Sequence, residues 1–176
     1  MTDRLPLAEL RDKVVIPACA VLSLLSGRDL ASRDAVRFLL CATLQEDPKQ
    51  QRRQQKRDGS GPLPGYEGAF GLCQIELRTV RRLQKHDVMR RIPAFGVLLA
   101  SAQAEALCDE MAKPGGDILS FMLGRGLLLC DPYKIPSEQQ AAYVCYDQRV
   151  WRPGYKRPQA WAANWKTATD LTEHLA

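Results

Sequence analysis

The sequence predicts a mainly helical protein built around one hydrophobic core. Apolar residues recur at helical spacing through most of the 176 residues, and no stretch shows the regular alternation of a half-buried strand. Hydrophobic residues make up 45% of the chain and charged residues 26%, which is ordinary for one globular domain of this length. The only β structure that we expect is a small hairpin within residues 58–72. We divide the single domain, 1–176, into an N-terminal helical segment (1–30), a core (31–150) and a Trp-rich tail with a last helix (151–176).

The boundaries of the expected helices follow from proline and glycine. Residues 7–26 are expected to form the first helix, which Pro17 splits or kinks and Gly27 ends. The second is expected over residues 33–46, because Pro48 disfavours helical geometry at the residue before it. It is apolar on most of its circumference, which places it in the middle of the domain. The remaining helices are expected at 73–85, 94–112, 116–130, 138–150 and 159–173.

A long loop follows the second helix. Residues 49–57 carry five positive charges in nine positions, and residues 59–66 have the glycine and proline content of turns. A loop of this length inside a compact domain is usually functional or disordered. With the formal net charge of +5, it indicates an anionic partner such as cell wall, nucleic acid or an acidic protein, although most charge runs are solvated loops. The basic stretch lacks aromatic residues for base stacking, so we expect any contact with nucleic acid to be unspecific.

Composition gives several other classes of function little support. The two histidines, His86 and His174, stand in polar surroundings, and no pair of the six cysteines has C-x-x-C spacing. We therefore expect no metal and no cofactor, and we interpret the cysteines as small buried hydrophobes. No apolar run reaches the roughly 18 residues that a membrane span needs. The N-terminal residues lack the pattern of a secretory signal, which leads us to expect synthesis in a reducing cytosol.

The second helix ends in a carboxylic acid, although a base would suit that position better. Glu46 shares a helix face with Leu39 and Ala42, so burial would favour the neutral acid. The partial negative charge at a helix C-terminus acts in the same direction. Both effects predict a raised pKa, which a general acid needs if it is to protonate a leaving oxygen near neutral pH. The alternative is a glutamate that only solvates the helix end.

A second polar segment follows about 25 residues after Glu46. It reads Gly71-Leu72-Cys73-Gln74 and leads into Glu76. Glycine at 71 would let the backbone approach a substrate closely, and the amide of Gln74 offers a donor and an acceptor to a sugar or its N-acetyl group. An ordinary junction between loop and helix is the alternative. A glutamate at a helix end followed by such a turn is the arrangement of a glycan-cleaving site.

These segments resemble the lysozyme-like lytic transglycosylase superfamily. There the catalytic Glu is typically followed by Ser, and a Gly-Leu-Met-Gln-like turn lines the cleft; Asp47 and Cys73 depart from this pattern. The sequence is more similar still to a set of small bacteriophage proteins of that fold, which have an Arg-rich loop and a tail rich in Trp, Arg, Pro and Gly. Residues 127–132 and 151–161 resemble that tail. The resemblance covers about residues 39–165.

The resemblance implies a goose-type or soluble lytic transglycosylase-like fold and cleavage of peptidoglycan glycan strands. Glu46 would protonate the oxygen between N-acetylmuramic acid and N-acetylglucosamine, and would then take the proton of the muramoyl 6-hydroxyl as a 1,6-anhydro ring closes. Gly71, Leu72 and Gln74 would line the substrate cleft. Glu76 is a further cleft candidate, and as a second carboxylate it would make the protein a hydrolase.

Two tyrosines on the expected helix 138–150 complete the candidate site. Tyr143 and Tyr146 are three residues apart and share a helix face. Superfamily members commonly place a tyrosine from a late helix near the acid, so one of the two is expected to contact Glu46 or the sugar. Core packing is the alternative for both. The three tryptophans of the tail are expected to clamp the last helix to the body of the protein.

Two functions of different classes fit these observations. The first is a bacteriophage peptidoglycan-cleaving enzyme, carried in the virion and acting at the cell wall during genome entry. The second is a virion protein that keeps the lysozyme-like fold without the activity, and whose basic surface serves assembly or contact with DNA. Asp47 and the basic loop favour the second reading. Both allow a homo-oligomeric assembly with other virion proteins, and neither includes a membrane span.

Overall fold

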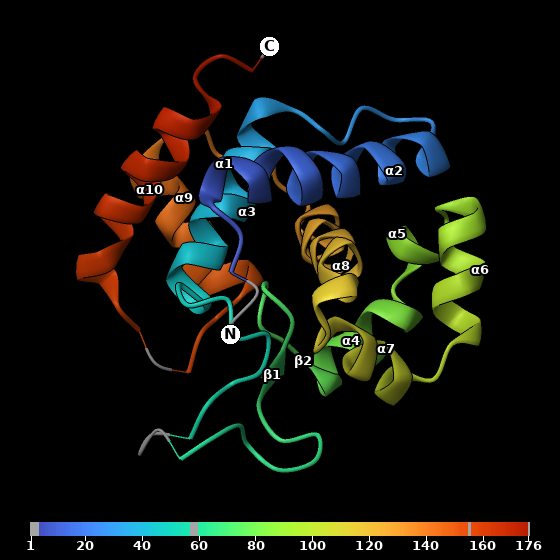
Figure 1. Ribbon diagram of the computed structural model, residues 1–176. Helices are drawn as coiled ribbons and strands as arrows, with labels where there is room; N and C mark the ends of the chain where they lie inside the picture. Colours follow the sequence, from blue (N-terminus) through green and yellow to red (C-terminus); the bar gives the residue numbers. More distant parts are fainter. Residues whose placement is uncertain (1–3, 57–59, 155, 176) are drawn as a thin grey trace.

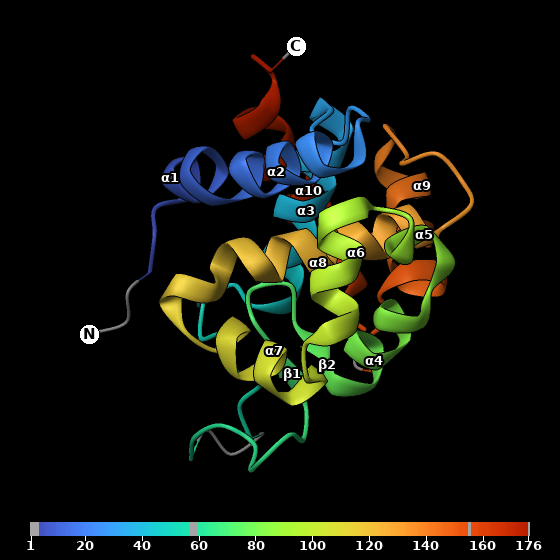
Figure 2. The ribbon, with the colours of Figure 1, turned by 90° about the vertical axis from the view of Figure 1, so that its right-hand side faces the viewer.

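Helix α8 (Asp117–Cys130) runs through the middle of the molecule, and most other helices pack around it (Figures 1 and 2). The computed structural model describes residues 4–56, 60–154 and 156–175. Within these ranges the chain is mainly helical with one two-stranded hairpin, which confirms the predicted fold class at that level. Glycine lets other segments come close to α8: a Cβ at Gly124 would lie 2.7 Å from the Sγ atom of Cys73.

The N-terminal helix is continuous through Pro17. It consists of α1 (Leu7–Leu10), a π turn η1 (Arg11–Val15) and α2 (Ile16–Ser26), as the predicted range 7–26 requires. Proline has no N–H for the carbonyl one turn earlier, and the wider π turn lies at that place. Gly27 ends the helix in the left-handed conformation with φ of 66°, as predicted.

Helix α3 (Arg33–Glu46) has the predicted boundaries and carries the candidate acid at its end. Ten of its fourteen residues are buried, and its most extensive contacts are with α10 (Pro158–Thr172). The backbone N–H of Asp47 still bonds to the carbonyl of Thr43 at 2.8 Å, but the φ and ψ angles of Asp47 are no longer helical. The helix therefore ends where Pro48 predicts.

The hairpin lies further along the chain than expected. Strand β1 (Ala69–Phe70) pairs antiparallel with β2 (Ile75–Glu76), whereas the sequence predicted a hairpin within 58–72. Helix α4 (Leu77–Lys85) consequently begins four residues after the predicted residue 73. The connecting residues turn back because Gly71 and Gln74 adopt left-handed φ angles of 68° and 48°. The preceding loop runs alongside β1, with the N–H of Gln54 bonded to the carbonyl of Ala69 at 3.0 Å.

The remaining predicted helices match the structure to different degrees. The predicted helix 94–112 is two helices, because Ala102 and Gln103 have extended backbone angles. The predicted helices 116–130, 138–150 and 159–173 are confirmed to within one or two residues. The elements not yet given are α5 (Asp87–Arg90), α6 (Pro93–Ser101), α7 (Ala104–Met111), the 3₁₀ turn η2 (Pro114–Gly116), α9 (Gln139–Val144) and the π turn η3 (Cys145–Val150).

One hydrophobic cluster extends from the first helix to the last. Its members range from Leu10 to Ala168, so the segments 1–30, 31–150 and 151–176 share a core. All six cysteines are free, and all but Cys130 are buried, as their apolar surroundings predict. Trp161 and Trp165 are also nearly inaccessible to solvent, and both attach α10 to the core as expected.

Candidate active site

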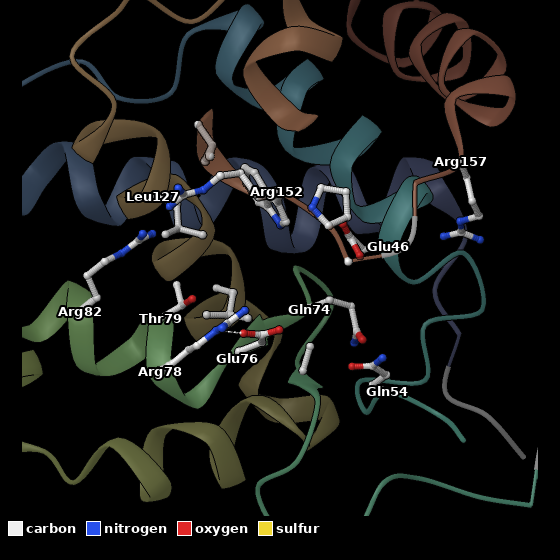
Figure 3. A pocket seen from close by; sticks show the side chains of 16 residues that line it. Glu46, Gln54, Gln74, Glu76, Arg78, Thr79, Arg82, Leu127, Arg152 and Arg157 are labelled. Carbon is white, nitrogen blue, oxygen red and sulfur yellow. Dashed lines mark hydrogen bonds and ion pairs between the residues drawn. The ribbon is translucent and has the colours of Figure 1, made fainter. Parts of the chain in front are cut away.

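A groove of about 1240 Å³ opens beside the C-terminal end of α3 (Figure 3). One wall consists of Glu46 and the chain between η3 and α10, and the other consists of the hairpin and the start of α4. In the first wall, Glu46 therefore lies beside residues that follow it by about a hundred positions in the sequence. Its lining residues are Glu46, Gln54, Ala69, Gln74, Ile75, Glu76, Arg78, Thr79, Arg82, Leu127, Val150, Trp151, Arg152, Pro153, Gly154 and Arg157.

Neighbouring contacts fix the end of α3 that carries Glu46. The preceding side chain, Gln45, is 1% exposed and donates from Nε2 to the carbonyl of Arg157 at 2.9 Å. Its Oε1 accepts a hydrogen bond of 2.9 Å from Nδ2 of Asn164. Because Arg157 precedes α10 and Asn164 lies within it, these contacts tie the last turn of α3 to the last helix.

The carboxyl group of Glu46 is half-buried and faces the groove (Figure 3). Burial raises the pKa of this carboxyl above its usual range. A hydrogen bond from Tyr146 and the charge of Arg157 oppose this effect, while the charges of Asp47 and Glu76 add to it. No salt bridge to Glu46 occurs within the described residues. The protonated acid is therefore favoured over the carboxylate to a higher pH than for an exposed glutamate.

Tyr146 contacts the acid directly, and Tyr143 does not. The hydroxyl of Tyr146 donates a hydrogen bond to Oε1 of Glu46. Its ring stacks on Trp161 and Trp151, with centroid distances of 4.8 and 6.2 Å. Burial and the neighbouring Glu46 raise the pKa of Tyr146, so its hydroxyl remains a donor. Tyr143 packs on Trp161 with a centroid distance of 5.5 Å and is absent from the groove lining. It is therefore not at the position that we predicted for a substrate-binding residue.

The acid next to Glu46 points into the protein. Asp47 is 5% exposed, and its two carboxyl oxygens accept hydrogen bonds of 2.8 Å from the backbone N–H groups of Gln51 and Arg52. Burial raises the pKa of Asp47, and these two bonds oppose the rise. Asp47 is therefore a structural residue that closes the turn after α3, and its charge adds to the raised pKa of Glu46 from behind.

The basic loop is only partly solvated, contrary to the default expectation for a charge run. Arg52 is 5% exposed and forms a two-point ion pair with Asp117, at 2.7 and 2.8 Å. The guanidinium of Arg53 lies 4.3 Å from the centre of the Phe70 ring and donates to the carbonyls of the 60–65 turn. Two of the five charges thus hold the loop against the body of the protein. Arg57, which the prediction also counted, lies outside the described residues.

Gly71 and Leu72 do not line the groove, although the sequence interpretation placed them at the substrate. A Cβ on residue 71 would lie 2.4 Å from the Oγ atom of Ser120, and Leu72 is fully buried. The Ser120 hydroxyl also accepts a hydrogen bond of 3.1 Å from the N–H of Cys73. Glycine is needed here because the turn packs tightly on α8, and the close approach is between two parts of the protein.

Gln74 and Glu76 do line the groove, across from Glu46 (Figure 3). The side chain of Gln74 is positioned by its left-handed backbone and by a hydrogen bond of 2.8 Å from Nε2 to the carbonyl of Gly71. Glu76 forms an ion pair with the exposed Arg78. Of the predicted site residues, Glu46, Gln74 and Glu76 line one groove, while Tyr146 is 2% exposed, does not line the groove and bonds to Glu46.

Sequence reasoning missed the other polar residues of the groove. It gave no role in the site to Gln54, Arg78, Arg82, Arg152 or Arg157. Arg78 and Arg82 are one turn apart on α4, directly after the candidate turn, and this spacing was the available signal. Nothing in the sequence indicates that residues 152 and 157 return to the same groove.

Other kinds of site receive no support from the described residues. Among residues 4–56, 60–154 and 156–175, no three His, Cys, Asp or Glu side chains are grouped so that they could hold a metal ion. Across the same ranges, every helix is too short or too polar to span a bilayer. In the comparisons with known proteins, no family model, no curated protein and no solved structure matches this chain.

Proposed function

We propose that the protein is a lytic transglycosylase that cleaves the glycan strands of peptidoglycan, with Glu46 as its acid and base. The observation that carries the proposal is a carboxyl group whose pKa is raised by burial and that nevertheless opens on a polar groove. Such a carboxyl is suited to protonate the oxygen of a glycosidic bond. The groove, at about 1240 Å³, is larger than the roughly 300–1,000 Å³ of most small-molecule sites, and this size suits a polymer.

The first step needs a proton on the groove side of Glu46. The hydroxyl of Tyr146 occupies Oε1, so the proton is carried on Oε2. Glu46 gives this proton to the oxygen that bridges C1 of N-acetylmuramic acid and C4 of N-acetylglucosamine. The C1–O bond breaks, and the glucosamine unit leaves with a 4-hydroxyl. The hydrogen bond from Tyr146 stabilises the carboxylate that results.

The second step returns the proton to Glu46. The carboxylate accepts the proton of the muramoyl 6-hydroxyl while O6 bonds to C1, which forms the 1,6-anhydro ring. One residue thus serves as acid and then as base. Gln74, across the groove, offers its amide to the sugar or its N-acetyl group. Glu76 is paired with Arg78 on that wall, which favours a reaction with a single carboxylate over one that activates water.

The two features that favoured an inactive structural protein have internal explanations. Asp47 closes the turn behind the acid, and Arg52 and Arg53 hold the basic loop to the core. None of these three residues lines the groove, and their contacts lie within this chain. We extend the proposal to a bacteriophage protein carried in the virion that acts at the cell wall, on the strength of the sequence resemblance alone.

Mass spectrometry of cell-wall digests tests the proposal. The wild-type protein should release anhydro-muropeptides, and Glu46→Gln should lower the rate by about 10²–10⁴-fold, the usual contribution of a general acid or base. Glu173→Gln, at an exposed position, is the matched control and should leave the rate unchanged. Products with reducing ends would identify a hydrolase instead. Absence of products from the wild type, or equal rates for wild type and Glu46→Gln, would remove the enzymatic proposal.

A further inference from the structure

The charged residues of the groove are unevenly distributed. Four arginines line it, against the two glutamates at positions 46 and 76. Glu76 is paired with Arg78, and no salt bridge among the described residues involves Arg82, Arg152 or Arg157. Figure 3 shows Arg82 at one end of the groove and Arg157 at the other, with Glu46 and Glu76 between them. The groove therefore carries arginines along both walls, and its two carboxyl groups lie between Arg82 and Arg157.

The cationic surface continues beyond the groove along α4. A second hollow of about 460 Å³ shares Arg78 and Arg82 with the groove and adds Arg81, Lys85 and His86. Arg78 and Arg82 follow each other by one helical turn, so they present neighbouring guanidinium groups on one face. We call Arg78, Arg82 and Arg152 the arginine arm. Its length, from the groove into the second hollow, suits an extended anionic chain rather than a single ion.

The charge pattern limits the ligand that could lie in both parts of the site. A nucleic acid carries one phosphate per nucleotide, so it would place negative charge beside Glu46 and Glu76 as well as along the arm. A polymer that is uncharged at the acid and negative in a side branch matches the groove better. An arginine guanidinium binds a carboxylate through two parallel hydrogen bonds, and all the groove cations are arginines rather than lysines.

We propose that the arginine arm binds the carboxylates of the acidic stem peptide attached to the muramoyl residue next to Glu46. This inference rests on the proposed function, because it takes the glycan strand to lie between Glu46 and Gln74. The stem peptide branches from the lactyl group of the sugar whose C1–O bond is broken, and its carboxylates extend along α4 toward Arg82. The neutral sugars then lie beside Glu46 and Glu76, and the carboxylates of the peptide meet the arginines of the arm.

Binding to walls with and without stem peptides tests the inference. All proteins carry Glu46→Gln so that the wall stays intact, and the amount that sediments with purified wall is measured at low and moderate salt. One wall sample is treated with an amidase that removes the peptides from the lactyl groups. The arm variant is Arg82→Gln with Arg152→Gln. The control, Arg28→Gln with Arg33→Gln, removes the same charge from exposed positions near the far end of α3.

The parent protein is the one that carries only Glu46→Gln. We expect it to bind peptide-bearing wall about tenfold more tightly than amidase-treated wall, and this difference should shrink as salt rises. The arm variant should lose this difference, and the control should keep it. Arg82→Lys should recover only part of it, because lysine cannot form the two-point bond. A thermal melt of each variant checks that it is folded. Equal binding to both walls, or an equal loss in the control, would overturn the inference.

Two further results separate this inference from its neighbours. If duplex DNA displaces the parent protein from both walls equally, and the arm variant no longer binds DNA, the arm belongs to a phosphate backbone and the inference is wrong. If binding depends on the stem peptide but wild-type protein releases no muropeptides, the subsite stands and the proposed reaction fails. The first assay reports on the arm, and the second reports on Glu46.

Discussion

The turn after α3 has a core side and a groove side, and the polar groups of the two sides differ in burial and in hydrogen bonding. On the core side, Asp47, Arg52 and Asp117 are each about 5% exposed, and their charged groups are bound to one another or to backbone. On the groove side, Glu46 has one hydrogen bond and an open face, and the arginines opposite are exposed. Neighbouring acids in the sequence thus have different tasks. The core side fixes the shape of the turn, and the polar groups of the groove side stay accessible.

The largest effect is expected from a substitution on the core side, which should lower the unfolding free energy. Arg52→Ala leaves the carboxylate of Asp117 buried without its partner, which should cost about 3–5 kcal/mol of unfolding free energy. Urea unfolding measures this loss. The exposed pair between Arg78 and Glu76 is the contrast, because Arg78→Ala should leave the urea midpoint almost unchanged. Equal losses for the two variants would show that the core side and the groove side do not differ in this way.

A substitution at Gly71 tests whether the turn between β1 and β2 belongs to the core side. Gly71→Ala places a Cβ against the hydroxyl of Ser120 and forces alanine into a left-handed conformation, so a loss of about 1–3 kcal/mol is expected. Gly115→Ala is the control, because a Cβ there meets open space. Thermal unfolding distinguishes the two. A stable Gly71→Ala protein that loses only wall binding would return residue 71 to the substrate side.

On the groove side, removing a charge should stabilise the protein in a pH-dependent way. The pKa of Glu46 is raised in the folded state, so its neutral form supports the fold below the ordinary pKa of 4.5, and that support is lost as pH rises through the folded pKa. Glu46→Gln cannot ionise, so its stability relative to wild type should increase between pH 4 and pH 8. Each unit of raised pKa is worth about 1.4 kcal/mol. A difference that does not change with pH would contradict the assigned pKa.

The smallest effect is expected from a substitution at Tyr146, which bonds to Glu46. The hydroxyl of Tyr146 lowers the pKa of Glu46 by stabilising its carboxylate, so Tyr146→Phe should raise that pKa further while keeping the aromatic stack. Titration of the ¹³C-labelled carboxyl of Glu46 by NMR measures the shift, and the alkaline limb of wall cleavage should move to higher pH with it. Tyr143→Phe should produce neither change, since Tyr143 stacks in the core. A fall in the pKa would mean that the hydroxyl stabilises the protonated acid.

The sequence predicted local features of the fold better than distant pairings. The boundaries of α3 and the left-handed end at Gly27 follow from proline, glycine and apolar spacing within a few residues, and both are confirmed. The start of α4 was predicted wrongly, because the hairpin that delays it depends on a turn that packs against α8. The burial of Arg52 could not be predicted, since its partner is 65 residues away in the chain.

The candidate site shows the same division. The expected pKa of Glu46 depended on its own helix, and the structure places that carboxyl among buried neighbours beside a groove. The pattern Gly-Leu-x-Gln could not say which of its residues face outward: Gln74 lines the groove, while Leu72 is fully buried. The two tyrosines could not be distinguished by spacing: Tyr146 lies in the π turn η3 and bonds to Glu46, whereas Tyr143 lies in α9 and packs on Trp161.

The long chain separation between the acid and its tyrosine has a consequence for the timing of synthesis. Tyr146 follows Glu46 by 100 residues, and the partners of Gln45 come later still. At about 5–20 residues per second, the ribosome adds Tyr146 roughly 5–20 s after Glu46. Until then the end of α3 has neither its aromatic cover nor the contacts that fix it, so the carboxyl stays hydrated and titrates as an ordinary glutamate. A nascent chain would therefore lack the raised pKa of Glu46 until η3 and α10 have emerged and docked.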